Sequence, residues 1–503
     1  MRREISVLYL SSEVVPFSKT GGLADVAGAL PAALARLGCR VTVATPYYGD
    51  LLTGKFRTKP VNGPLVSVPV GSETLGLSAR TLDSEPGAVS YIFGANSEVL
   101  ARPGLYSEPD GGPGYEDNDV RFILFCRGML EWIKRSGRRP DIIHLNDWQT
   151  ALVAPFLRIL YAGDPFFAGT RTVLTVHNLA YQGEFPGERF ELLGLNQEQF
   201  SPLSPFEFWG KVNFLKAGLV YASKINTVSP TYAREIQTDE TIGSGLDGVL
   251  RGRGRDLTGI LNGIDTQVWN PATDRLIEKT FGPADLELGK SINKKALLKR
   301  AGLPAVRWDR PLIGIISRLA DQKGFDLIQK AASRLFALDI NLIVLGTGEQ
   351  RFHDLFKKLA KRHADRLAVF LTFDNALAHQ IEAGADMFLM PSRYEPCGLN
   401  QMYSLAYGTV PIVRATGGLA DTVIDADSDP QNGTGFVFTE YTPSAMLRAV
   451  RRAITAWGDG ARWSRIRHSG MKLDFSWNHS AANYISLYED ALQVDAPAAI
   501  HHH

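Results

Sequence analysis

A glutamate and a pair of glycines are the residues of this chain whose types and spacing could do chemistry. Glu395 comes shortly after the apolar run Met387–Met390, and Gly417 and Gly418 come shortly after the apolar run Val410–Val413. Such short apolar runs are typical of strands buried in a parallel sheet, where ligands bind beyond the carboxyl ends. A glycine pair before a helix lets the backbone approach an anion and aims N–H groups at it. One loop therefore offers a carboxylate and the other a phosphate cradle.

The glycine pair occurs twice, which strengthens this interpretation. The sequence Thr-Gly-Gly-Leu-Ala-Asp is found at Thr416–Asp421 and again at Thr20–Asp25, with Gly21 and Gly22 as its glycines. A chance repeat of this kind is very unusual, so either a duplication or two similar ligand loops in two similar domains explains it. Lys19 directly precedes the first copy, and its ammonium group could reach whatever that loop binds.

Composition excludes several classes of protein. The chain has 503 residues with a formal net charge of +1, which argues against nucleic acid or a membrane surface as the main partner. No apolar run approaches the roughly 18 residues that a membrane span needs. The three cysteines show no metal or redox spacing and fit a reducing compartment, so we expect a cytoplasmic protein. His501–His503 resemble part of an expression tag and are not expected to belong to the fold.

Apolar runs alternate with helical patterns along most of the chain, which predicts an α/β fold of two Rossmann-like, doubly wound domains. We expect the first domain over residues 1–257, the second over 258–474, and a tail at 475–503 whose helix crosses back to the first domain. Within the first domain, Pro31 should bend or split the helix that begins near Leu23. A mobile loop is expected around residues 109–114, after two hairpin strands. Asp425, Asp427 and Asp429 imitate the start of a calcium loop, but Pro430 stands where glycine is needed, so we expect a solvated turn.

Several charged or polar side chains follow predicted strands and should meet at the carboxyl edges of the sheets. Arg318 and Lys323 would neutralise a diphosphate without a metal, because guanidinium and ammonium groups both bind phosphate. We expect Glu395, His177 and Asp147 to face one another across an interdomain cleft, where they would hold sugar hydroxyls and stabilise positive charge at a glycosyl carbon. A buried, hydrogen-bonded histidine is the alternative for His177, since no other ligand stands at metal spacing. These residues predict transfer of a sugar from a nucleotide sugar but leave the sugar open.

At this point the sequence resembles the bacterial glycogen synthase and plant starch synthase family. The resemblance covers nearly the whole chain, and its motifs occur in the family's order. They are Lys19-Thr-Gly-Gly-Leu-Ala-Asp-Val26, His177-Asn-Leu-Ala-Tyr-Gln-Gly183, Asn262-Gly-Ile-Asp265, Ser317-Arg-Leu with Gln-Lys-Gly324, Ser392-Arg-Tyr-Glu-Pro-Cys-Gly-Leu399 and Thr416-Gly-Gly-Leu-Ala-Asp-Thr422.

The resemblance implies a GT-B glycosyltransferase that moves glucose from ADP-glucose to the 4-OH of an α-1,4-glucan, with retention of configuration and no metal or other cofactor. It also implies that Glu395, His177, Asp147, Lys19, Arg318 and Lys323 form the catalytic group. The donor-binding set that it implies is Lys19, Gly21, Gly22, Asn262, Arg318, Lys323, Phe373, Glu395, Cys397, Gly398, Leu399, Thr416, Gly417 and Gly418. Retention without an evident nucleophile fits the front-face route proposed for the family, in which the leaving phosphate oxygen takes the acceptor proton.

The sequence departs from the family pattern at a few positions. Asn146-Asp-Trp-Gln149 stands where the family often has His-Asp-Trp-His, Phe373 replaces a common tyrosine, and Asn400 replaces a threonine. Tyr403 occupies the place of a second glutamate found in related transferases. These departures leave the choice between ADP- and UDP-glucose open. The rival readings are another GT-B enzyme, such as a sucrose- or trehalose-type synthase or an epimerase, and a glucan-binding protein without activity.

Overall fold

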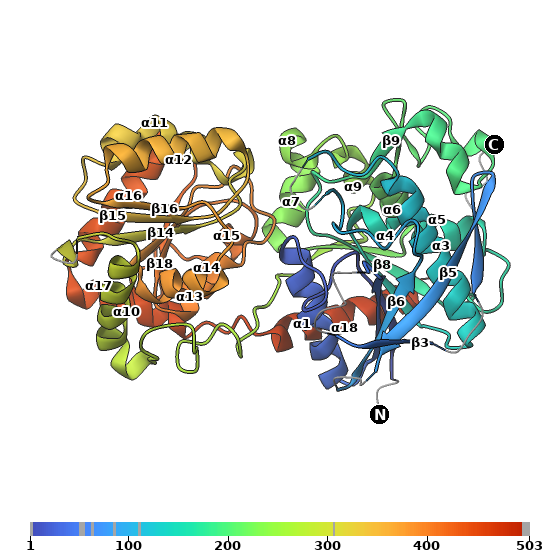
Figure 1. Cartoon of the computed structure of the whole chain (residues 1–503), viewed down its shortest axis with the longest axis horizontal. Coiled ribbons are helices and arrows are strands. Elements are labelled where there is room, and N and C mark those ends of the chain that lie inside the picture. The colour runs from blue at the N-terminus through green and yellow to red at the C-terminus, as the bar shows by residue number, and fades with distance from the viewer. Residues whose placement is uncertain are drawn as a thin grey trace. The chain divides into compact units, whose positions relative to one another are not determined.

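The computed structural model describes residues 4–49, 56–61, 65–83, 87–108, 112–304 and 307–494. The chain divides into two compact units, coloured along the chain in Figure 1. The first comprises Met1–Val228, Ala233–Gly263 and Trp477–His503, and the second comprises Ser229–Tyr232 and Ile264–Ser476. Each unit is built on one large sheet with helices on both faces.

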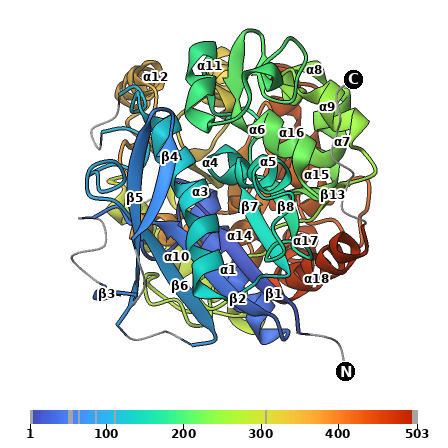
Figure 2. The ribbon, with the colours of Figure 1, turned by 90° about the vertical axis from the view of Figure 1, so that its right-hand side faces the viewer.

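The sheet of the first unit has ten strands, most of them parallel, in the order β13-β12-β8-β7-β1-β2-β6-β5-β3, with β4 paired to β5. Strands β5, β4 and β3 are antiparallel to their neighbours, and Figure 2 shows the β4–β5 hairpin at one side of the sheet. The strands are β1 (Ser6–Leu10), β2 (Arg40–Pro46), β3 (Thr58–Pro60), β4 (Val66–Val70), β5 (Glu73–Leu82), β6 (Val89–Ala95), β7 (Ile142–Asn146), β8 (Arg171–Val176), β12 (Lys224–Thr227) and β13 (Leu257–Gly259).

Helices cover this sheet because successive residues of a strand point to opposite faces. Val7 and Tyr9 of β1 pack in one apolar cluster with α1 and α18. Helix α3 contacts β4, β5 and β6, and helix α4 contacts β7 and β8. A small sheet of β9 (Glu184–Pro186), β10 (Glu207–Phe208) and β11 (Lys211–Asn213) is separate. The helices are α1 (Gly22–Arg36), α3 (Asn118–Ser136), α4 (Asp147–Ala151), α5 (Val153–Ile159), α6 (Phe214–Tyr221), α7 (Pro230–Thr238, of which residues 233–238 belong to this unit), α8 (Glu240–Gly243), α9 (Asp247–Gly252) and α18 (Trp477–Gln493).

The second unit contains a parallel sheet of six strands in the order β16-β15-β14-β17-β18-β19. Ile313 and Ile315 pack with α11, α12 and α16, whereas Leu312 packs with α10 and α13, so both faces are buried. Figure 1 shows these two helix layers on opposite sides of the sheet. The strands are β14 (Leu312–Ile316), β15 (Asn341–Leu345), β16 (Leu367–Phe370), β17 (Met387–Met390), β18 (Val410–Arg414) and β19 (Phe436–Phe438). The helices are α10 (Leu286–Arg300), α11 (Phe325–Leu335), α12 (Gln350–Arg362), α13 (Asn375–Gly384), α14 (Asn400–Ala406), α15 (Gly417–Thr422), α16 (Pro443–Trp457) and α17 (Gly460–Met471).

The two units separate after Gly263, a few residues beyond the boundary expected after residue 257. The strand β13 lies between these two points and pairs in parallel with β12 of the first sheet. The C-terminal helix α18 belongs to the first unit, where the hydroxyl of Tyr488 lies 2.6 Å from Nδ1 of His144.

Two local expectations also need revision. The helix α1 runs without interruption from Gly22 to Arg36 through the buried Pro31, so the expected split does not occur, and the expected bend stays a prediction. The calcium-like sequence does not form a purely solvated turn, because Asp425 is in an ion pair with Arg452. Nη2 of the arginine lies 2.6 Å from Oδ2 of the aspartate. Of the loop predicted at 109–114, residues 109–111 lie outside the described part of the chain. Among the residues that the structure describes, no helix has the length and apolar character needed to span a membrane.

Candidate active site

Three loops at one edge of the first sheet bring together several of the predicted site residues. Strands β8, β7 and β1 are parallel neighbours, so the loops after their carboxyl ends share that edge. Asp147 follows β7 and His177 follows β8. The backbone N–H of His177 donates to Oδ1 of Asp147 at 2.7 Å, and Nε2 of His177 lies 2.9 Å from Oδ1 of Asn146. The predicted pair of Asp147 and His177 is therefore in direct contact.

Asp147 has the backbone and the environment of a specialised residue. Its φ of 54° is in the left-handed region, which is uncommon for a residue with a side chain and costs energy. Burial raises the pKa of Asp147 to about 7, although the amide groups of His177 and Asn178 donate to its carboxylate and act in the opposite direction. The carboxyl group thus titrates near neutral pH.

His177 is a neutral imidazole at physiological pH. Burial lowers its pKa to about 3, because a charged ring would lose its hydration. The amide nitrogen of Asn146 donates to the carbonyl of Leu10 at 2.8 Å, which orients Oδ1 of Asn146 toward the ring. Nε2 of His177 then carries the proton and donates to that oxygen, and Nδ1 is left as an acceptor. Asn146, one of the departures from the family pattern, therefore sets the tautomer of the histidine.

The loop after β1 carries Lys19 on the same edge. Nζ of Lys19 is 2.7 Å from Oδ1 of Asp25, in the first turn of α1. Glu13 stabilises this loop, because its carboxylate accepts hydrogen bonds from the backbone amides of Thr20 and Gly21. The sequence by itself gives Glu13 no evident role. One sequence signal could have indicated this role. A carboxylate stands a few residues before the glycine motif, and the backbone amides of that motif need an acceptor.

Trp148 is a packing residue. Its ring lies 5.0 Å from the ring of Phe122 and 5.8 Å from that of Phe185, centroid to centroid. Gly183 has a φ of +64° and approaches so closely that a Cβ there would lie 2.4 Å from Cε3 of Trp148. The tryptophan thus fastens the loop after β8 to the helix after β7.

In the second unit, Glu395 and Lys323 form an ion pair at the edge of the sheet. Strands β14, β17 and β18 are neighbours, and their carboxyl ends carry Lys323, Glu395 and the second glycine pair. Nζ of Lys323 lies 2.6 Å from Oε2 of Glu395, and the hydroxyl of Ser392 donates to the same oxygen at 3.0 Å. Glu395 is 5% exposed, so this carboxylate has a fixed position.

The glycine pair lets the two loops of the second unit come into backbone contact. A Cβ on Gly417 would lie 1.9 Å from the carbonyl oxygen of Glu395, and a Cβ on Gly418 would lie 2.0 Å from that of Cys397. The amide of Gly418 donates to the carbonyls of Glu395 at 3.1 Å and Pro396 at 3.2 Å. In this structure the amide of Gly418 holds the glutamate loop in place, and its role as a phosphate donor stays a prediction.

The remaining predicted donor residues lie on loops of both units. Arg318 is exposed on the loop that also carries Lys323, and Phe373 is 77% exposed after β16. Asn262 lies in the first unit, 5% exposed, and its Oδ1 accepts no hydrogen bond from the described residues. A buried amide oxygen without a partner fits a group that binds a ligand. Cys397 is buried, Gly398 has a φ of +69°, Leu399 precedes α14, and Thr416 precedes α15.

Tyr403, at the position of the second glutamate of related transferases, has a structural role. Its ring stacks on Trp269 with centroids 3.8 Å apart, and His379 stacks on the other face of the tryptophan at the same distance. Asn400, another departure, donates from its amide to the carbonyl of Ile316 at 2.7 Å. Both residues connect α14, which follows the Glu395 loop, to the rest of the second unit.

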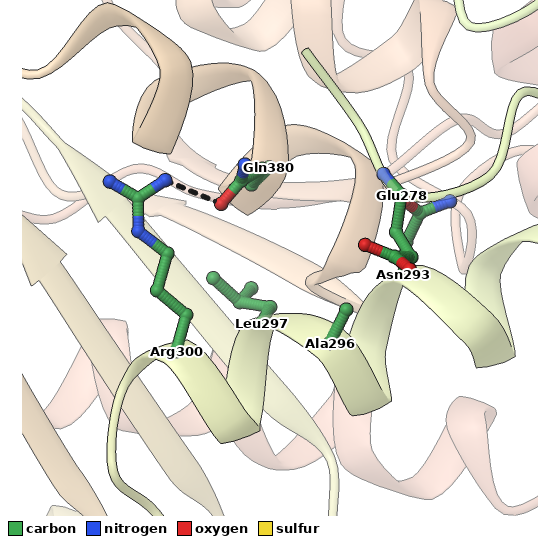
Figure 3. A pocket seen from close by; sticks show the side chains of 6 residues that line it. All are labelled: Glu278, Asn293, Ala296, Leu297, Arg300 and Gln380. Carbon is green, nitrogen blue, oxygen red and sulfur yellow. Dashed lines mark hydrogen bonds between the residues drawn. The ribbon is translucent and has the colours of Figure 1, made fainter. Parts of the chain in front are cut away.

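A pocket between α10 and α13 in the second unit is distinct from these residues. Figure 3 shows Arg300 and Gln380 reaching toward each other over it, with Nη1 of Arg300 donating to Oε1 of Gln380 at 2.6 Å. Its lining residues are Glu278, Asn293, Ala296, Leu297, Arg300 and Gln380. None of the sequence-predicted site residues lines this pocket, so it forms no part of the candidate site. Within the described part of the chain, no three His, Cys, Asp or Glu side chains are grouped so that they could hold a metal ion.

Comparisons with known proteins agree over almost the whole chain. The family profile described as "Starch synthase catalytic domain" matches residues 6–252, and the one described as "Glycosyl transferases group 1" matches residues 304–467. A glycogen synthase of Koribacter versatilis is 48% identical over 98% of this chain and 100% of its own length. A glycogen synthase of Anaeromyxobacter sp. is 49% identical over 96% of this chain and 99% of its own.

Solved structures agree with the sequence comparisons. The catalytic domain of starch synthase IV from Arabidopsis thaliana, bound to ADP and acarbose, matches with a TM-score of 0.88 and 35% identity, covering 98% of this chain and 100% of that one. A sucrose-phosphate synthase from Thermosynechococcus elongatus matches with a TM-score of 0.58 and 18% identity, covering 97% of this chain and 99% of that one. The second likeness concerns the fold alone.

Proposed function

The chain belongs to the glycogen synthase and starch synthase family, and on this premise we propose that it transfers glucose from ADP-glucose to the non-reducing 4-OH of an α-1,4-glucan. It is a glycosyltransferase of the GT-B fold, with two Rossmann-like units. The predicted family and fold class are therefore confirmed. The donor, the acceptor and the role of each residue are the finer parts of the proposal.

The main observation behind the proposal is the ion pair between Lys323 and Glu395. The two side chains meet at 2.6 Å beside Gly417 and Gly418, and both lie at the carboxyl edge of a parallel sheet, where nucleotides bind in such folds. Lys323 gives a fixed positive charge for the diphosphate, and Arg318 on the same loop gives a second one. Because charge on the leaving diphosphate grows in the transition state, such preorganised groups assist its departure.

The first unit supplies a neutral imidazole and a carboxyl group near its titration point. The family relation supports placing His177 and Asp147 at the reaction centre, with Lys19 beside the donor and Asn262 in contact with it. In the front-face route, the bond from the anomeric carbon to the diphosphate oxygen breaks as the acceptor oxygen bonds to the same face. The acceptor proton passes to the departing phosphate oxygen. A histidine with a pKa of about 3 serves this route by hydrogen bonding without taking a permanent charge.

The charge is supplied by side chains in this proposal, so no metal or other cofactor takes part. The acceptor is glycogen or a maltooligosaccharide, and neither nucleic acid nor a membrane is a partner. Cys39, Cys126 and Cys397 are buried thiols that form no disulfide, which supports a cytoplasmic location as part of the same proposal.

A direct assay tests the proposed reaction. Purified protein is incubated with glycogen and either ADP-[14C]glucose or UDP-[14C]glucose, and label in the polymer is measured. We expect incorporation from ADP-glucose, with label released as glucose by an enzyme specific for α-1,4 bonds. Incorporation from UDP-glucose alone would contradict the donor, and a low-molecular-weight labelled product would favour a sucrose- or trehalose-type enzyme.

A further inference from the structure

The first copy of the repeated Thr-Gly-Gly-Leu-Ala-Asp sequence is closed around an anion that the chain itself supplies. Glu13 lies seven residues before Thr20, and its carboxylate accepts a short hydrogen bond from the amide of Thr20. It accepts another from the amide of Gly21 at 3.2 Å, and the Thr20 hydroxyl lies 3.0 Å from both carboxylate oxygens. The hydroxyl of Tyr106 lies 3.4 Å from Oε1. The glycine-motif amides are therefore engaged by a carboxylate within the protein.

The second copy is engaged in another way. There, the amide of Gly418 donates to main-chain carbonyls of the loop that carries Glu395, and the glycines permit the contact of two backbones. By contrast, a Cβ on Gly21 would meet nothing within 4 Å. The two copies thus have the same sequence but different structural roles. The second copy fastens a loop to a loop, whereas the first copy presents its donors to one acidic side chain.

Glu13 is suited to this position as an ion. It is 4% exposed, and every partner named above donates to it, so an acceptor with two oxygens is required. It lies at the start of α1, a helix of 15 residues whose N-cap is Gly21, where the helix dipole stabilises negative charge. Burial raises the pKa of Glu13 above its usual range, and the hydrogen bonds from Thr20, Gly21 and Tyr106 oppose this rise without cancelling it.

These contacts fix the loop that presents Lys19. The carboxylate joins the start of the loop to its end, and inside it the amides of Phe17 and Ser18 donate to the carbonyl of Val14 at 2.8 and 3.0 Å. Lys19 directly precedes Thr20, whose amide and hydroxyl both contact the carboxylate of Glu13. We propose that Glu13 is an internal substitute for a bound anion and a positioning residue for Lys19. This proposal rests on the proposed function only in the assumption that Lys19 contacts the sugar nucleotide.

The test removes the carboxylate of Glu13 and then supplies formate as a small anion in its place. The variant Glu13→Ala leaves the amides of Thr20 and Gly21 without their acceptor and opens space for formate. We expect its KM for ADP-glucose to rise about tenfold or more, as the loss of a charged hydrogen-bonded acceptor predicts, with a smaller change in kcat. Sodium formate should raise the melting temperature of this variant and lower its KM. The wild type should respond to formate no more than to sodium chloride of equal ionic strength.

Two further variants complete the test. Glu13→Gln keeps the shape but turns an amide donor toward other donors, so its KM should rise and formate should not restore it, because the side chain still fills the space. Asp239→Ala is the matched control, since Asp239 accepts from the amides of Thr241 at 2.9 Å and Ile242 at 3.0 Å at an exposed turn of the same unit. It should leave KM unchanged and gain no formate response. Should Glu13→Ala fail to fold, Glu13→Gln carries the test of KM.

The outcomes separate this proposal from the proposed reaction. An unchanged KM in a folded Glu13→Ala, or an equal formate effect on the melting temperatures of variant and wild type, would overturn the role of Glu13. If the wild type transfers no glucose from ADP-glucose, the proposed function fails instead. The melting temperatures with and without formate still decide whether Glu13 occupies an anion position.

Discussion

The close contact between the glycine pair and the glutamate loop predicts the effect of one methyl group. In Gly418→Ala, the new Cβ would lie 2.0 Å from the carbonyl oxygen of Cys397 and 2.6 Å from its carbonyl carbon and its Cα. All three atoms belong to the backbone, so no side-chain rotation relieves the overlap. The loop that carries Glu395 must therefore move by about 1 Å, and a misplacement of that size can cost about 100-fold in rate.

The effect on stability should be much smaller than the effect on turnover. Moving the loop weakens the hydrogen bonds from the amide of Gly418 to the carbonyls of Glu395 and Pro396, each worth about 1 kcal/mol. We expect the six-stranded sheet to be unaffected, because Gly418 lies in α15 and in none of its strands. We therefore expect Gly418→Ala to fold with a modestly lower melting temperature, followed by circular dichroism, and to lose about 100-fold in kcat with ADP-[14C]glucose and glycogen.

Gly460→Ala is the matched control for this prediction. Gly460 is the first residue of α17 in the same unit, and a Cβ there would meet nothing within 4 Å. Replacing glycine by alanine in a helix stabilises it by up to about 1 kcal/mol, so this variant should keep full activity. Wild-type turnover in a folded Gly418→Ala would refute the reasoning that backbone contact positions Glu395.

Three other predictions follow from the site. Glu395→Ala should remain folded and lose at least about 100-fold in kcat in the same radiolabel assay, because it removes the fixed partner of Lys323; near-normal turnover would contradict that role. A chelator should leave activity unchanged because Arg318 and Lys323 supply the positive charge, whereas a loss that magnesium restores would exclude the metal-free proposal. Asp147, with a folded-state pKa raised to about 7, should make the free energy of unfolding fall as pH rises from about 4 to about 7, since the folded state binds more protons there. Asp147→Asn should flatten this dependence in denaturant titrations at several pH values, and an unchanged slope would show that Asp147 is already ionised.

Sequence alone was enough for the features that depend on local pattern. The apolar runs Met387–Met390 and Val410–Val413 indicated strands β17 and β18 close to their observed bounds, because a strand buried on both faces must be apolar throughout. The rule that ligand loops follow parallel strands then indicated that the Glu395 loop would meet the glycine pair. Motif order was sufficient to indicate the family.

Other features depend on atoms that are distant in sequence, and these only the tertiary structure decided. The place of Leu257–Gly259 in the first sheet was decided by the pairing of β12 with β13, which is invisible in a local pattern. Likewise, identical six-residue sequences gave no hint that one copy would bind the carboxylate of Glu13 and the other the main chain of the Glu395 loop. The sequence determined which donors each loop offers, and long-range packing determined which acceptor reaches them.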